Sequence, residues 1–171
     1  MTSREESIVN VKTAEIRHEG GMRFLATTGS GHTITFDDRA DDGGPGPTET
    51  IAAALGACTA MDVASIALKK RQEVAAYAIH VRAEQRDEYP RVFTSIEIVH
   101  DIAGPAVSEA AIRRCIELSA IKYCPISSML AAGDTTIHHR YRIRNTGPKP
   151  FEVEGEVIAT GPYTRPVPLR G

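Results

Sequence analysis

The sequence is poor in cysteine, in net charge and in long uninterrupted apolar runs, and each shortage excludes a class of protein. Three cysteines cannot form a fully paired disulfide scaffold. A formal net charge of −2 gives no bulk attraction to nucleic acid or to an anionic membrane. No apolar run approaches the roughly 20 residues that a membrane span needs, and residues 1–7 lack the apolar segment of a signal peptide. We therefore expect a soluble, cytoplasmic protein that binds neither nucleic acid nor membrane and keeps its cysteines as thiols unless they are catalytic.

Common cofactor and metal motifs are also missing. The segment Gly43-Gly44-Pro45-Gly46 lacks the lysine and the following serine or threonine of a phosphate-binding loop. His138 and His139 are neighbours on a predicted strand, so they point to opposite faces, and no Cys-x-x-Cys pair occurs. We expect no metal site and no organic cofactor.

The residue pattern predicts one domain of the α+β class. A chain of 171 residues with 42% hydrophobic content can bury a core without disulfides. Alternating apolar residues predict strands at 8–18, 22–28, 32–36, 77–84, 92–102 and 137–144, and helical spacing predicts helices at 46–70, 109–121 and 125–132. The expected order is βββ-α-ββ-αα-β. Beyond residue 144 the glycine and proline content rises, which indicates a domain at 1–144 and a C-terminal extension at 145–171 with room for one more strand at 151–160.

The helix at 46–70 is the centre of this arrangement. Its residues are apolar or small nearly all round, apart from a narrow polar line through Thr59, Asp62 and Ser65, so most of its circumference should be packed. Cys58 lies at its middle. Taken alone, Cys58 is either a small apolar core residue or a reactive thiol.

Cys124 stands in a different local setting. It directly precedes Pro125, which is typical of a first helical residue, so Cys124 is predicted to be the N-cap of a short helix. Free N–H groups at such a position lower a thiol pKa, and an unperturbed value of about 8.5 leaves only about 3% thiolate at neutral pH. Cys124 is therefore a candidate nucleophile or leaving group. Cys115 follows apolar helical spacing and is predicted to be a packing residue.

Several segments together resemble the OsmC/Ohr family, and within it the OsmC-like branch of YhfA-type proteins. They occur in order over roughly residues 8 to 144, and they are Phe36-Asp37-Asp38-Arg39, Gly46-Pro47-Thr48-Glu49, the stretch 54–63 around Cys58, Glu84-Gln85-Arg86 with Pro90-Arg91-Val92-Phe93, and Cys124-Pro125-Ile126-Ser127. The resemblance implies an OsmC-like fold, in which antiparallel sheets wrap two central helices of an intertwined homodimer.

The resemblance also implies a chemistry, the thiol-dependent reduction of organic hydroperoxides. Cys58 would be the peroxidatic thiolate that becomes a sulfenic acid, and Cys124 the resolving thiol that forms a disulfide with it before an external dithiol reduces both. In the family an arginine held by a glutamate activates the first thiolate. Here the resemblance implies Arg39 and Glu49 for these roles, although the Ohr branch has its acid where Thr48 stands.

Other residues keep alternatives open. Arg23, Arg86 and Arg91 are substitutes for Arg39. Glu49 lies nine residues before Cys58, on the opposite face of an ideal helix, and Asp62 lies one turn after Cys58, where a charged carboxylate would oppose thiolate formation. The alternative function is a non-enzymatic dimeric module that binds a small molecule or senses redox state.

Overall fold

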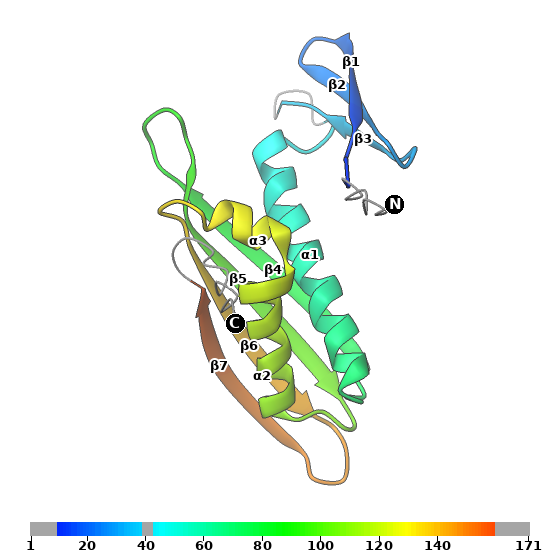
Figure 1. Ribbon diagram of the computed structural model, residues 1–171, viewed down its shortest axis with the longest axis vertical. Helices are drawn as coiled ribbons and strands as arrows, with labels where there is room; N and C mark the ends of the chain where they lie inside the picture. The colour runs from blue at the N-terminus through cyan, green and yellow to red at the C-terminus, as the bar shows by residue number, and fades with distance from the viewer. Residues whose placement is uncertain (1–9, 39–42, 160–171) are drawn as a thin grey trace, which may run out of the picture. The chain divides into compact units, whose positions relative to one another are not determined.

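The computed structural model describes residues 10–38 and 43–159 (Figure 1). The elements follow the predicted order βββ-α-ββ-αα-β, with a further strand at the end and one π-helical turn, η1, between α2 and α3. They are β1 (Ala14–Gly20), β2 (Arg23–Thr28), β3 (Thr33–Phe36), α1 (Pro47–Lys69), β4 (Ala76–Gln85), β5 (Phe93–Gly104), α2 (Glu109–Leu118), η1 (Ser119–Tyr123), α3 (Pro125–Leu130), β6 (Thr136–Asn145) and β7 (Phe151–Ala159). The chain forms two compact units, Met1–Thr50 and Ile51–Gly171.

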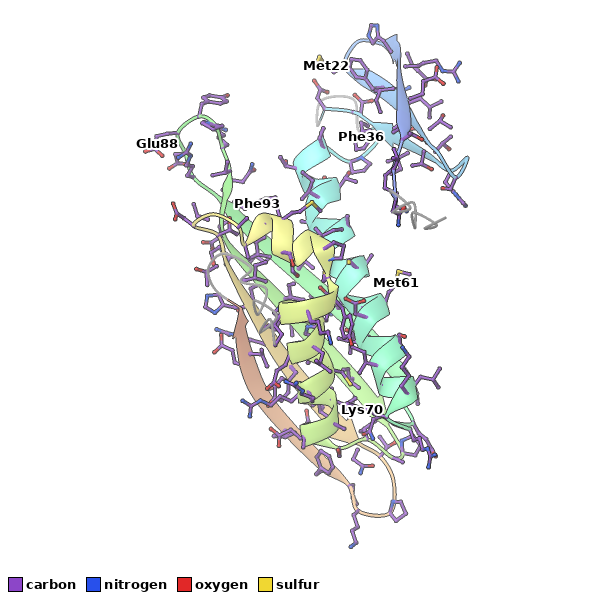
Figure 2. The ribbon with its side chains drawn as sticks, in the orientation of Figure 1. Met22, Phe36, Met61, Lys70, Glu88 and Phe93 are labelled. Carbon is purple, nitrogen blue, oxygen red and sulfur yellow. The ribbon has the colours of Figure 1, made fainter. Side chains whose placement is uncertain are left out.

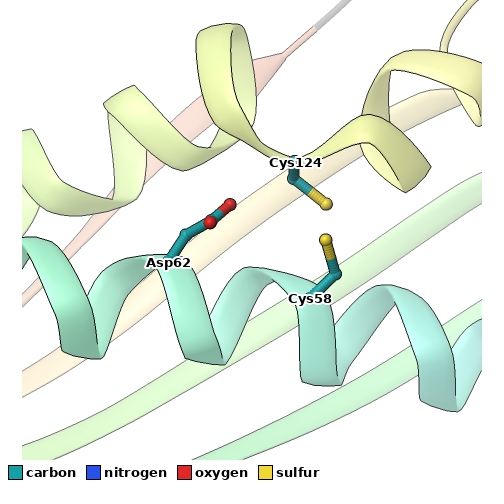
Figure 3. Close-up of side chains that lie close together, drawn as sticks. All are labelled: Cys58, Asp62 and Cys124. Atoms are coloured by element: carbon teal, nitrogen blue, oxygen red, sulfur yellow. The ribbon is translucent and has the colours of Figure 1, made fainter. Parts of the chain in front are cut away.

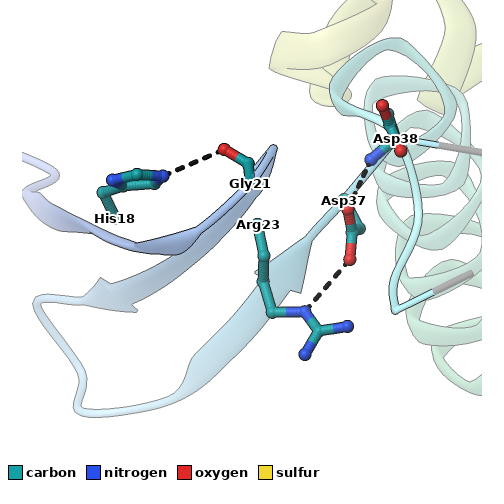
Figure 4. A network of polar contacts seen from close by, with 5 residues as sticks. All are labelled: His18, Gly21, Arg23, Asp37 and Asp38. Atoms are coloured by element: carbon teal, nitrogen blue, oxygen red, sulfur yellow. Dashed lines mark hydrogen bonds and ion pairs between the residues drawn. The ribbon is translucent and has the colours of Figure 1, made fainter. Parts of the chain in front are cut away.

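The N-terminal unit is an antiparallel meander in the order β1-β2-β3. Gly20 and Gly21 turn the chain between β1 and β2 with φ angles of 108° and 55°, which favour glycine. The side chain of Arg23 is committed within this unit, since its Nε atom donates to Oδ2 of the buried Asp37 at 3.0 Å (Figure 4). Arg23 therefore already has a carboxylate partner.

The C-terminal unit is a four-stranded sheet in the order β4-β5-β6-β7, with the three helices on one of its faces (Figure 1). The pairs β4–β5 and β6–β7 are antiparallel, but β5 and β6 are parallel. The expectation of wholly antiparallel sheets was wrong for this pair, because α2 and α3 carry the chain back to the end of the sheet where β5 began.

Strand β7 lies in the part of the chain that was predicted to follow the domain. It pairs with the whole length of β6, from Asn145 opposite Phe151 to Ile137 opposite Ala159, so the extra strand expected at 151–160 is present. The boundary between a domain at 1–144 and an extension at 145–171 stays a prediction.

The core of the C-terminal unit lies between this sheet and the helices. One cluster joins Val63 of α1 to Ile112 of α2 and Ile143 of β6, and a second joins Leu55 of α1 to Ile98 of β5. Helix α1 contributes to both clusters and so runs along the whole packed face. Packing of this kind fixes the position of every side chain on the inner face of α1.

Glycine is needed at one point of this contact. A Cβ atom at Gly56 would lie 2.8 Å from Cγ2 of Val81, so the absence of a side chain lets α1 pack closely against β4. This close contact lies two residues before Cys58 and determines how near that part of α1 lies to β4.

Helix α1 has 23 residues and is long and apolar enough, by length and composition alone, to cross a membrane. Thr59, Asp62 and Ser65 interrupt its apolar residues, so the helix holds no uninterrupted apolar run of this length, but its alanines keep the mean hydropathy high. Core helices of soluble proteins pass the same test. Leu55, Val63 and Ala67 are buried by the protein itself.

Candidate active site

The site lies where the middle of α1 faces the junction between α2 and α3. Cys58 and Asp62 are one helical turn apart on α1, and Cys124 faces them across the gap (Figure 3). The two sulfur atoms and a carboxylate oxygen of Asp62 all lie within 4.8 Å of one another. Folding thus brings together the two cysteines that the sequence analysis selected and adds a carboxylate to them.

Cys124 is the N-cap of α3, as its place before Pro125 predicted. Its sulfur accepts a hydrogen bond from the backbone N–H of Ser127 at 3.4 Å. The hydroxyl of Thr59 donates to the same sulfur at 3.9 Å. With only 1% of its surface exposed, Cys124 is a thiol held in place by two donors and shielded from water.

Cys58 is more exposed than Cys124, and its surroundings disfavour its ionised form. Burial, Cys124 and Asp62 together raise the pKa of the Cys58 thiol from 9.0 to about 12, although a hydrogen bond from the backbone of Ile126 acts in the opposite direction. The thiol is therefore protonated at neutral pH unless a further positive charge is supplied.

Asp62 is itself held in place. The hydroxyl of Ser119, in η1, donates to Oδ2 of Asp62 at 2.9 Å. The role of Ser119 was missed in the sequence analysis. A usable signal was present, because a buried hydroxyl in an apolar stripe needs a hydrogen-bond partner, and Asp62 belongs to the polar line of the facing helix.

Arg39 and Glu49, the two residues implied for thiol activation, are not tested by the structure. Arg39 lies outside the described residues. Glu49 is an exposed acid in the first turn of α1 and belongs to the N-terminal unit. The roles of Arg39 and Glu49 stay predictions.

The substitute arginines of the C-terminal unit act in their own hairpin. Nε of Arg86 donates to the carbonyl oxygen of Pro90 at 2.6 Å, and Nε of Arg91 donates to the carbonyl oxygen of Asp87 at 3.2 Å. These bonds join the two ends of the β4–β5 loop. Both arginines therefore have a structural task in that loop.

The third cysteine is a packing residue, as predicted. Cys115 is fully buried in the cluster formed by α1, α2 and β6, and its sulfur donates to the carbonyl oxygen of Ala111 at 3.1 Å. Burial raises the pKa of the Cys115 thiol, which makes it unreactive.

The fold and the site together define a class of α+β proteins in which a thiol in the middle of a core helix faces a second thiol at a helix N-cap. The chain belongs to the OsmC-like family, since the family model described as "OsmC-like protein" matches residues 40–140. This membership indicates a soluble OsmC-like fold.

Individual relatives agree with this assignment. The chain is 37% identical to Protein YhfA of Escherichia coli over 130 residues, which cover 76% of this chain and 96% of that protein. A hypothetical protein from Aquifex aeolicus is 29% identical, with a TM-score of 0.69 and coverage of 79% of this chain and 97% of that one. An organic hydroperoxide resistance protein OsmC from Legionella pneumophila shares the fold at 14% identity, with a TM-score of 0.58 and coverage of 81% and 98%.

Proposed function

We propose that this protein is a cytoplasmic thiol peroxidase that reduces organic hydroperoxides. Cys58 attacks the O–O bond, which breaks to release an alcohol and leaves a sulfenic acid on Cys58. The thiol of Cys124 then displaces water from this sulfenic acid, and an external dithiol reduces the resulting disulfide. The observation that carries the proposal is the position of the two sulfur atoms, which face each other within 4.8 Å.

The exposure of the two cysteines supports this division of roles. Cys58 is partly exposed, so a hydroperoxide can reach it, whereas Cys124 is 1% exposed. A buried thiol that meets the oxidised partner from the protein side is suited to resolution. A disulfide needs an S–S distance of about 2.05 Å. Rotation of the two side chains toward each other would shorten the S–S distance toward this value.

Activation of Cys58 requires a positive charge. With its pKa raised to about 12, the Cys58 thiol is almost entirely protonated at neutral pH. Arg39, oriented by Glu49, is the cation that we assign to this task. An adjacent arginine lowers a neighbouring pKa by about 1–3 units, which still leaves a minority of thiolate and predicts slow turnover.

A homodimer is part of the same proposal. Helix α1 exposes large apolar side chains, with 42% of Ile51, 74% of Met61 and 77% of Leu68 open to solvent in the single chain. Figure 2 shows Met61 projecting outward from the helix. A second copy that covers this face should bury more than about 2,000 Å², as obligate dimers do.

The test is stopped-flow consumption of an organic hydroperoxide with a dithiol reductant, combined with intact mass spectrometry. Cys58→Ser should abolish consumption, since a hydroxyl is far less ionised than a thiol. Arg39→Ala should slow the first step and still allow the disulfide to form. Cys115→Ser is the matched control and should change neither rate nor stoichiometry. An unaffected Cys58→Ser protein would remove the peroxidase proposal.

One observation favours a second candidate function. The high pKa of Cys58 suits a module that binds a small molecule or senses redox state without turnover. Such a module would react once with the hydroperoxide and would not sustain consumption when a dithiol is supplied in excess. Sustained turnover distinguishes the peroxidase from the module.

A further inference from the structure

We propose that Cys58, Asp62 and Cys124, with their thiols reduced, form a binding site for zinc. The two sulfurs and the carboxylate oxygen lie within 4.8 Å of one another and converge on one point (Figure 3). Thiolate, thiolate and carboxylate form a ligand set that zinc accepts. No metal motif is visible in the sequence because two of the ligands belong to α1 and the third follows η1.

The spacing of the ligands fits a tetrahedral metal centre after a small adjustment. Zinc bonds of about 2.3 Å to sulfur and about 2.1 Å to oxygen place the ligand atoms roughly 3.5 to 3.8 Å apart. The observed limit of 4.8 Å thus needs a contraction of about 1 Å, which changes in side-chain torsion supply. With three protein ligands, the fourth position remains for water.

The charges of the cluster also suit a cation. Two thiolates and a carboxylate carry three negative charges when ionised. Among the groups that act on Cys58, Cys124 and Asp62 both carry a negative charge when ionised. A divalent cation would compensate charges that otherwise repel one another.

Neighbouring polar groups already orient the ligands. The Ser119 hydroxyl occupies Oδ2 of Asp62 and so fixes the plane of the carboxylate, and the sulfur of Cys124 accepts from Thr59 and from the Ser127 N–H. Outer hydrogen bonds of this kind position ligands in metal sites and strengthen binding. The thiols therefore sit in a site that is organised before zinc arrives.

Zinc binding depends only on this geometry, whereas its release by hydroperoxide rests on the proposed peroxidase function. In that step the zinc dithiolate, one hydroperoxide and two protons give the disulfide, an alcohol, water and free Zn²⁺. The thiolates lose two electrons and the O–O bond gains them. Zinc would thus protect the reduced thiols and leave when they are oxidised.

The experiment titrates Zn²⁺ into the reduced full-length protein in competition with a chromophoric chelator. We expect one zinc per chain. Cys58→Ser and Cys124→Ser should weaken binding by roughly 100-fold or more, and Asp62→Asn, which keeps a side-chain oxygen for the neighbouring hydroxyl, by roughly tenfold. Cys115→Ser and Asp134→Asn are matched controls that should bind zinc as the parent does.

Oxidised parent protein gives a test that needs no substitution. Diamide, which oxidises thiols without a peroxide, should form the Cys58–Cys124 disulfide and release the zinc. Zinc retained by the oxidised protein, or bound equally well by Cys58→Ser or by Asp62→Asn, overturns the proposed site. Release by diamide without release by an organic hydroperoxide supports the zinc site and counts against the peroxidase.

Discussion

Acidification should destabilise the protein through three buried, hydrogen-bonded side chains that the proposed chemistry does not use. The hydroxyl of Tyr77 lies 2.8 Å from Nδ1 of His100, and Nε2 of His100 lies 3.1 Å from Nδ1 of His139. Both histidines are fully buried between the sheet and the helices, and Nε2 of His139 has no partner among the described protein atoms. Neither ring can take up a proton without placing a charge in the core.

The magnitude follows from the difference between the folded and unfolded chains. Burial lowers the pKa of His100 from 6.5 to about 3, with a smaller contribution from His139. Burial lowers the pKa of His139 from 6.5 to about 4, with a smaller contribution from His138. Burial raises the pKa of Tyr77, which therefore stays neutral in this range. Each histidine lowers the free energy of unfolding by about 1.4 kcal/mol for every pH unit below its pKa in the unfolded chain. Acidification from about pH 7 to about pH 5 should therefore cost roughly 4 kcal/mol for the pair.

The sign of the effect is fixed by the direction of the pKa shifts. Because the folded pKa values lie below 6.5, the unfolded chain binds more protons as the pH falls. The two neutral histidines contribute fully to the free energy of unfolding above about pH 6.5, and this contribution is lost progressively toward pH 4 and below. Stability should therefore fall on acidification before the folded histidines titrate.

The assay is urea denaturation followed by circular dichroism at about pH 7 and about pH 5. The variant Tyr77→Phe/His100→Leu/His139→Leu replaces all three hydrogen-bonded side chains with apolar ones. Between the two pH values its free energy of unfolding should fall by about 4 kcal/mol less than that of the parent. The matched control His18→Gln/His32→Gln removes two exposed histidines of the N-terminal unit and should lose as much as the parent. An equal loss in the triple variant and the parent would refute the reasoning.

Three further predictions address the thiols, the assembly and the core. Cys124→Ser should consume about one equivalent of hydroperoxide per chain and then stop, and intact mass should show added oxygen on Cys58, because the sulfenic acid has no partner thiol. Met61→Lys should place charges in the proposed dimer interface, so the mass measured by light scattering should shift toward that of one chain. The control Glu88→Lys, at the tip of the β4–β5 loop (Figure 2), should leave the mass unchanged. A monomeric parent protein would contradict this prediction. Ile112→Ala removes a fully buried side chain and should lower the free energy of unfolding by about 2–5 kcal/mol in urea denaturation, while Ile121→Ala, at a position 53% exposed, should cost much less. Equal costs for the two isoleucines would show that the core has been misplaced.

Local sequence predicted the features that depend on a few adjacent residues. Cys124 caps α3 because Pro125 follows it. Alternation along β6 placed His139 on the opposite face from His138, and the structure buries the former and leaves the latter facing Glu156. Capping and alternation are set by backbone geometry within one element, so they can be predicted without knowing the fold.

Tertiary structure decided which of these elements meet. The parallel pairing of β5 with β6 depends on the path of the chain through α2 and α3, and this pairing allows His100 to contact His139. The packing of α1 against the α2–α3 junction brings Asp62 and Cys58 to Cys124. The sequence determines which residues lie on each face of a helix or strand. Contacts between distant segments depend on the packing free energy of the whole core, and this cannot be predicted from a local pattern.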